Sequence, residues 1–94
     1  MEPKTLIIKR NGRRPSEEFS RQKLHHSIVA ATLAVRGSIG QSEHIAKMVT
    51  SEVIDWLKDK PEVTSSDLRT EAGKHLRRYH PDAAYLYINH LSTL

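Results

Sequence analysis

The dipeptide Asn11-Gly12, placed directly after an apolar and β-branched run, most constrains the fold of this chain. Residues 5–9 (TLIIK) favour a short strand, and Asn and Gly both accept the positive φ angles of a tight type I′ turn. The chain is therefore expected to double back as a hairpin over about residues 5–16. The returning residues 13–16 are poor in β-formers, and Pro15 lacks the N–H of an interior strand position, so the second strand is expected at an edge.

Four segments with apolar residues at helical spacing follow the hairpin. The expected helices cover about residues 20–36, 42–59, 65–79 and 81–93. None of them is long enough to be stable alone, and an isolated two-stranded hairpin is only marginally stable. The sequence therefore predicts an α+β fold in which the N-terminal β-hairpin packs on a bundle of about four short helices.

Capping residues set the expected helix starts. Ser20 and Ser42 are expected to accept hydrogen bonds from N–H groups in the first turns of the first two helices. Residues 64–67 (TSSD) carry the same signal for the third helix, with an acid in its first turn. Pro81 suits the first position of the last helix, and residues 37–40 (GSIG) are expected to end the first one.

Size and composition narrow the class of protein. A length of 94 residues predicts one domain, residues 1–94, and the absence of cysteine excludes disulfides and thiolate zinc sites. Neither a signal peptide nor a membrane-spanning run is visible, so a soluble, cytoplasmic protein without membrane contact is expected. The net charge of +4 favours an anionic partner, such as a nucleotide or nucleic acid.

Basic residues gather around the predicted turn. Lys9 lies on the strand before it, and Lys23 is expected in the first turn of the following helix, where free N–H groups and the positive end of the helix dipole also point. Gly12 lets backbone approach a ligand closely. Two lysines that converge on one cleft predict a phosphate site, and Ile7 or Ile8 would form a wall beside an adenine.

The order of these pieces resembles the ATP-cone family. Its pattern is a strand, Lys-Arg-(Asp/Asn)-Gly-Arg, and then Phe-x-x-x-Lys-(Ile/Leu) at the start of a helix, as in residues 9–13 and 19–24 here. Residues 64–68 (TSSDL) are similar to the family's entry to its third helix, and residues 82–87 (DAAYLY) to its closing helix. The interval from Gly12 to Phe19 is about two residues longer than in the family pattern.

The resemblance implies a module that binds ATP or dATP, often with Mg²⁺, and regulates a larger protein without turnover of its own. That larger protein would be a ribonucleotide reductase or a regulator, and the partner a catalytic subunit, another protein domain or a second copy. Lys9 and Lys23 would contact phosphates, with Arg10 in support. The nucleotide-binding residues implied in this way are Ile7, Ile8, Lys9, Arg10, Asn11, Gly12, Arg13, Glu17, Lys23 and Arg69.

A small basic nucleic-acid-binding regulatory domain is the alternative. It would use the helical basic residues Arg69, Lys74, Arg77 and Arg78. A groove-binding helix has no need of two lysines flanking Asn11-Gly12, which favours the nucleotide. The six histidines lack the spacing of a helical metal site, and no nucleophile pattern is visible, so neither a metal centre nor an enzyme is expected.

Overall fold

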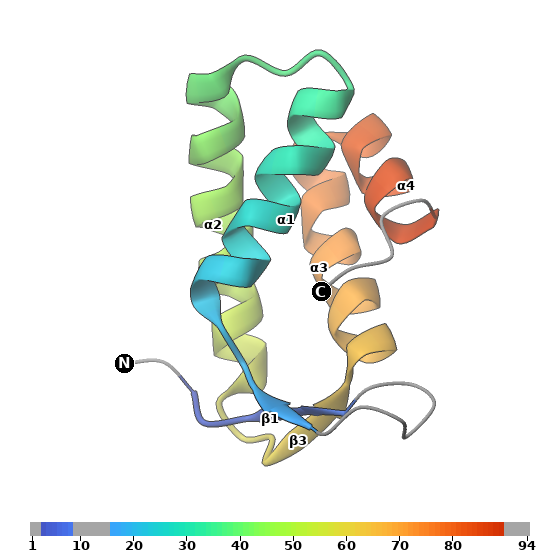
Figure 1. Cartoon of the computed structure of the whole chain (residues 1–94). Helices are drawn as coiled ribbons and strands as arrows, with labels where there is room; N and C mark the ends of the chain where they lie inside the picture. Colours follow the sequence, from blue (N-terminus) through green and yellow to red (C-terminus); the bar gives the residue numbers. More distant parts are fainter. Residues whose placement is uncertain (1–2, 9–15, 90–94) are drawn as a thin grey trace.

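A small sheet closes one end of a group of upright helices in the computed structural model (Figure 1). The structure describes residues 3–8 and 16–89, and all statements about it refer to these. The elements are β1 (Leu6–Ile8), β2 (Glu17–Glu18), α1 (Arg21–Ala34), α2 (Ile39–Leu57), β3 (Glu62–Thr64), α3 (Ser65–Tyr79) and α4 (Pro81–Asn89). This arrangement confirms the predicted α+β class with helices packed on an N-terminal β element.

The sheet has three strands in the order β2-β1-β3, one more than the sequence predicted. β1 pairs antiparallel with β2, Leu6 opposite Glu18, so the chain does double back as expected. The return strand was predicted at residues 13–16, most of which lie outside the described residues, and the described strand that pairs with β1 on this side is β2 at Glu17–Glu18. The turn at Asn11-Gly12 lies outside the described residues, so its type stays a prediction.

The third strand, β3, runs parallel to β1 with Ile7 opposite Val63. Leu6 donates its N–H to the carbonyl of Pro61 at 3.0 Å. The buried Thr5 hydroxyl donates to the carbonyl of Lys60 at 2.7 Å, which ties the start of β1 to the segment that follows α2. β1 is therefore the central strand, held on both sides.

Side-chain caps begin three of the helices. Ser20 accepts from the N–H of Lys23, and Thr64 from the N–H of Asp67, as predicted. The predicted cap at Ser42 was wrong: Ser38 caps α2 by accepting from Gln41, so the helix starts at Ile39. Ser42 lies inside the helix and is buried. Both serines have capping chemistry, but Ser38 has the extended backbone of an N-cap residue and Ser42 already lies within the helix.

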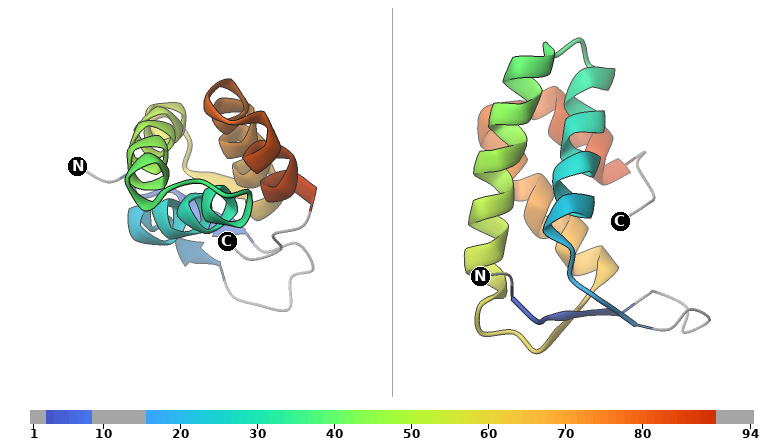
Figure 2. Two further views of the ribbon diagram at one scale, coloured as in Figure 1. Left: turned by 90° about the horizontal axis from the view of Figure 1, so that it is seen from above. Right: turned by 60° about the vertical axis from the view of Figure 1, so that its left-hand side comes forward.

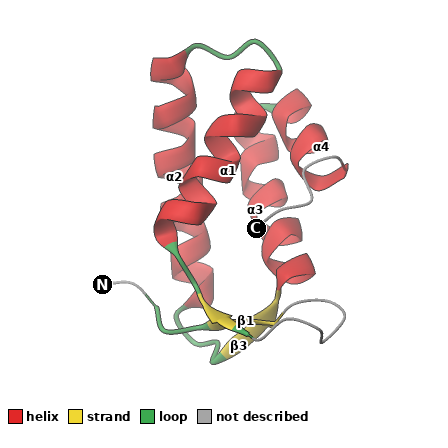
Figure 3. Cartoon of the chain, viewed as in Figure 1, coloured by secondary structure: helices red, strands yellow, loops and turns green. Residues whose placement is uncertain are grey.

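The helices form a ring around one apolar core. Seen from the end, α1 contacts α2 and α4, and α3 contacts the same two helices (Figure 2). Leu24, Ile28, Val49, Val53 and Leu76 are almost fully buried between them. The sheet lies across the end of this ring that carries the start of α1 and the start of α3 (Figure 3). No described helix is both long and apolar enough to span a membrane.

Candidate functional site

A small pocket lies where the sheet meets the first turn of α1. It is lined by Ile7, Glu17, Glu18, Phe19, Ser20, Lys23, Leu24 and Leu68. Its apolar members are all buried, and they come from β1, the segment after β2, α1 and α3. Its charged members stand on β2 and on α1. The pocket therefore joins an apolar floor to a polar edge, which are the two surfaces that a nucleotide requires.

Lys23 is the cation at the polar edge. Its Nζ lies 3.1 Å from Oε1 of Glu17, and the two side chains are 62% and 40% exposed. Its backbone N–H is the one that Ser20 caps. An ion pair this exposed adds little to stability, so an incoming phosphate can replace the carboxylate at the ammonium group at small cost. The N–H groups and dipole of the first turn of α1 favour the same anion.

The pocket is too small to enclose a purine by itself. Its cavity volume is about 20 Å³, far below that of sites which bury a whole small molecule. The pocket of the described residues therefore cannot enclose a nucleotide by itself. The predicted residues Lys9, Arg10, Asn11, Gly12 and Arg13 all lie outside the described residues. Their part in the site stays a prediction.

Three predicted residues meet at this pocket, namely Ile7, Glu17 and Lys23. Ile8 does not line it, because successive side chains of β1 point to opposite faces. Arg69 does not line it either, although the side chain of its neighbour Leu68 does. Both residues keep their assignment as a prediction.

The surroundings of Arg69 include the buried phenol of Tyr87. Burial raises the pKa of Tyr87 well above its usual value, while its hydrogen bond with Ser27 and the positive charge of Arg69 act in the opposite direction. The Tyr87 and Ser27 oxygens are 3.0 Å apart, and Ser27 Oγ donates to the carbonyl of Leu24 at 2.7 Å. Arg69 of α3 is thus near enough to Tyr87 of α4 for its charge to act on the phenol, a proximity that helical spacing alone could not reveal.

Phe19 and Leu68 belong to the pocket although neither was among the predicted binding residues. Both are buried and also line the pocket floor. Their apolar character gave no signal to separate the two roles.

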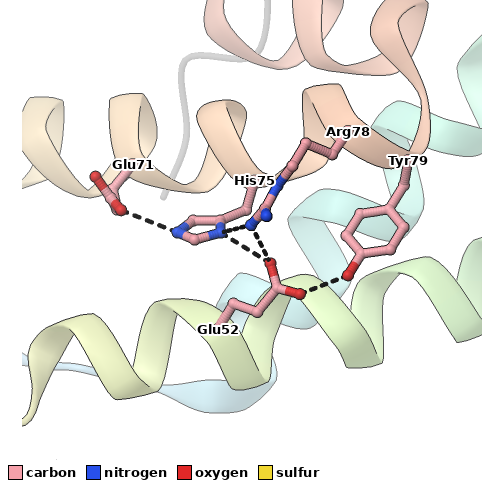
Figure 4. A network of polar contacts seen from close by, with 5 residues as sticks. All are labelled: Glu52, Glu71, His75, Arg78 and Tyr79. Carbon is pink, nitrogen blue, oxygen red and sulfur yellow. Dashed lines mark hydrogen bonds and ion pairs between the residues drawn. The ribbon is translucent and has the colours of Figure 1, made fainter.

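A second polar cluster lies between α2 and α3, away from this pocket (Figure 4). Glu52 accepts from the Tyr79 hydroxyl with one carboxylate oxygen, and its other oxygen lies 2.8 Å from Nδ1 of His75 and 3.1 Å from Arg78. The opposite ring nitrogen of His75, Nε2, lies 2.9 Å from Glu71. The carboxylate of Glu52 raises the pKa of Tyr79 through this hydrogen bond.

This cluster fastens α2 to α3, and its geometry does not suit a metal ion. The carboxylates of Glu52 and Glu71 lie on opposite sides of the His75 ring, so the three groups cannot converge on one ion (Figure 4). Across residues 3–8 and 16–89, no group of three or more His, Cys, Asp or Glu side chains could hold a metal ion.

The three tyrosines of the last two helices differ in exposure. Tyr79 and Tyr85 are 36% and 65% exposed. The ring of Tyr87 is buried, with 1% of its surface exposed. The hydrogen bond to Ser27 explains how a phenol is accommodated there.

Comparison with known proteins gave one match. The family whose description is "ATP cone domain" matches residues 5–90. Neither a curated protein nor a solved structure matches the chain. The matched range begins just before β1 and ends just after α4, so it includes every element of the pocket.

Proposed function

Since the chain belongs to the ATP-cone family, whose members are nucleotide-sensing regulatory modules, we propose that it binds ATP or dATP at the pocket between the sheet and α1. One observation carries the proposal. Lys23 stands at the N-terminal turn of α1 beside buried apolar residues of the pocket, and its ammonium group pairs with the exposed carboxylate of Glu17. The triphosphate would lie at the polar edge beside Lys23, and the purine would lie against the apolar residues of the pocket.

Each residue then has a chemical role. Lys23, together with Lys9 and Arg10, would hold the phosphates through charge-assisted hydrogen bonds. Ile7 would contact the base through its side chain and Ile8 through its backbone, with the backbone at Asn11, Gly12 and Arg13 in close approach. Arg69 would add a polar contact from α3. Mg²⁺ bound to the triphosphate would offset the negative charge of the phosphates. The carboxylate of Glu17 would lie close enough to contact this Mg²⁺, because it lies 3.1 Å from the ammonium group of Lys23.

Binding at this place would act on the fold through Glu17. Its carboxylate pairs with Lys23, and its backbone lies opposite Ile7 in the sheet. A phosphate that binds Lys23 would break the ion pair with Glu17, so the bound and free states would differ beside the β1–β2 pair. A nucleotide can shift such an equilibrium only by its differential affinity for the two states. The Lys23–Glu17 ion pair would supply this difference in affinity, because only one of the two states keeps it.

The regulated partner is proposed from the family alone. It would be the catalytic subunit of a ribonucleotide reductase, a regulator or a second copy of the chain. The nucleic-acid alternative is less well supported, because the Arg78 guanidinium bonds Glu52. Arg69 lies half-buried beside Tyr87 rather than on an open basic face.

Calorimetric titration with ATP, dATP, GTP and AMP tests the proposal, with phosphate release and molecular mass followed in the same samples. We expect saturable binding of ATP or dATP, weak binding of AMP and no phosphate release above background. The melting temperature should rise with nucleotide concentration by mass action. Steady phosphate release that Lys23→Met abolishes would make the protein a nucleotide hydrolase instead. A flat titration at millimolar nucleotide would contradict binding itself.

A further inference from the structure

His80 is the one residue between α3 and α4, and its backbone serves both helices. Its N–H donates to the carbonyl of Leu76 at 2.8 Å and closes α3, while its carbonyl accepts from the N–H of Ala84 at 3.0 Å. Its backbone is extended, with φ −157° and ψ 91°, as is usual for the residue before a proline. His80 therefore occupies the N-cap position of α4.

The ring of His80 supplies the capping acceptor. Its Nδ1 lies 3.3 Å from the backbone nitrogen of Ala83, the third residue of α4. An N-cap side chain commonly accepts from this N–H, and the acceptor is usually a hydroxyl, carboxylate or amide oxygen. Ser20, Ser38 and Thr64 cap the other three helices in that way. The start of α4 thus depends on a nitrogen that can take up a proton.

The cap at α4 requires the neutral ring of His80. A backbone N–H can donate only to a ring nitrogen that has no proton, so the neutral ring must carry its proton on Nε2. A second proton gives both ring nitrogens an N–H and removes the acceptor. It also places a positive charge at the positive end of the helix dipole. Imidazole makes this change between about pH 5 and pH 8.

The charged groups around His80 leave the ring free to change its protonation. Among the residues that the structure describes, the ring makes the capping hydrogen bond and no ion pair. On α3, Arg78 and Tyr79 bond Glu52 instead. Asp82, in the first turn of α4, is the acid nearest in the chain and favours the dipole. The other titratable residues in the last turn of α3 and on α1, which also contacts α4, are Arg77, Arg21, Lys23, His25 and His26.

Loss of the cap would act on α4 more than on the other helices. Ala83 is fully buried, so water cannot readily replace the lost acceptor at its N–H. α4 has nine residues, too few for a helix to be stable without its contacts. The α2–α3 pair is held differently, because the ring of His75 faces the carboxylates of Glu52 and Glu71, and a proton on that ring keeps both contacts.

We propose that His80 is a proton-operated cap, which makes α4 the element of this fold that loosens in mild acid while α1, α2 and α3 stay packed. The proposal does not rest on nucleotide binding.

NMR of the ¹⁵N-labelled protein between pH 8 and pH 5 tests the proposal. At pH 8 the ring of His80 should carry its proton on Nε2. Protection factors, which correct for the intrinsic pH dependence of amide exchange, should fall by about 2- to 30-fold at Ala83 and Ala84 as the ring takes up its second proton. This range is the one expected for loss of an N-cap. Protection at Val53 and Leu76, in the core of α2 and α3, should change little.

Two variants of His80 separate the cap from other effects of acid. His80→Asn provides a capping oxygen that does not titrate, so Ala83 should keep its protection at pH 5. His80→Ala should show low protection of Ala83 at both pH values. His44→Gln removes an exposed histidine from α2 and should respond like the parent.

Three outcomes would overturn the proposal. The first is a proton on Nδ1 of His80 at pH 8, because that ring could not accept from Ala83. The second is an equal fall of Ala83 protection in the parent and in His80→Asn, because another group would then be responsible. The third is a fall at Val53 and Leu76 as large as that at Ala83, because it would report acid unfolding of the whole domain.

Discussion

At the scale of single residues, Lys23 acts through two groups that can be separated. Its backbone N–H donates to the Ser20 hydroxyl and so helps to begin α1. Its side chain contributes the exposed ion pair with Glu17 and the positive charge at the pocket edge. Because the cap uses only the backbone, the side chain can be changed without loss of the helix start. Binding and folding are therefore separable at this residue.

We predict that Lys23→Met lowers the affinity for ATP by about 1.5–3 kcal/mol, because a charge-assisted hydrogen bond to phosphate is lost. The free energy of unfolding should change by less than about 0.5 kcal/mol, because the Glu17 pair is exposed. Calorimetry and thermal unfolding measure the two quantities. Lys74→Met, an exposed lysine on α3, serves as the matched control. Equal ATP affinity in both variants would show that the phosphates bind elsewhere.

At the scale of elements, local signals predicted the helices better than the strands. The bounds of α3 follow from Thr64, a cap that competes with no earlier one, and from an acid in the first turn. The start of α2 was misplaced because Ser38 and Ser42 carry the same chemistry four residues apart. β3 has three residues and one buried apolar side chain, Val63, and its partner β1 is distant in sequence. A strand this short with a partner this distant has no local sequence pattern that predicts it.

The central position of β1 changes what a damaged turn should do. We predict that Gly12→Val, which places a β-branched residue at the expected positive φ, releases β2 but leaves β1 paired with β3. Hydrogen exchange should then become fast at the Phe19 amide, which donates to Thr5, and stay slow at Leu6, which donates to Pro61. The parent protein should protect both amides.

Fast exchange at Leu6 as well would show that β1 cannot remain on β3 without β2. Unchanged protection at Phe19 would show that the turn tolerates a branched side chain and that Gly12 has no positive φ.

At the scale of the whole molecule, the last helix closes the ring by reaching back to the first. Tyr87 of α4 hydrogen-bonds Ser27 of α1 across 60 residues of sequence, inside the core. Burial raises the pKa of Tyr87, so the folded state holds the phenolic proton to a higher pH than the unfolded chain does. The stabilising effect of the neutral phenol is complete below its unfolded pKa of about 10 and is lost as the pH rises beyond it.

We therefore predict that the free energy of unfolding falls above about pH 10, and that Tyr87→Phe makes this fall shallower. The variant should lose about 1 kcal/mol at neutral pH, because the hydrogen bond to Ser27 disappears. Denaturant unfolding at a series of pH values measures both effects. Tyr85→Phe removes an exposed phenol from the same helix as a control. An equal alkaline slope for Tyr87→Phe and the parent would contradict a buried neutral phenol.

The pocket at Lys23 and the packing of Thr50 differ in how far the sequence alone could reveal them. Lys23 and Glu17 stand in a segment whose residue order matches a family pattern, so their place beside Ile7 could be anticipated. The unpartnered hydroxyl of Thr50 could not be anticipated, because no local pattern shows which neighbours reach it. Thr32 and Thr50 look alike in sequence, and only packing separates them.

The junction at Thr64 has a mechanical consequence. This residue is both the last of β3 and the cap of α3, so no linker residue lies between sheet and helix. A displacement of β3 would therefore move the first turn of α3 directly, because no flexible residue separates them. α3 in turn is fastened to α2 through the contacts of Glu52, which spread across one turn of the helix. A movement of β3 would thus rotate α3 and α2 together as one rigid pair, rather than fray the first turn of α3.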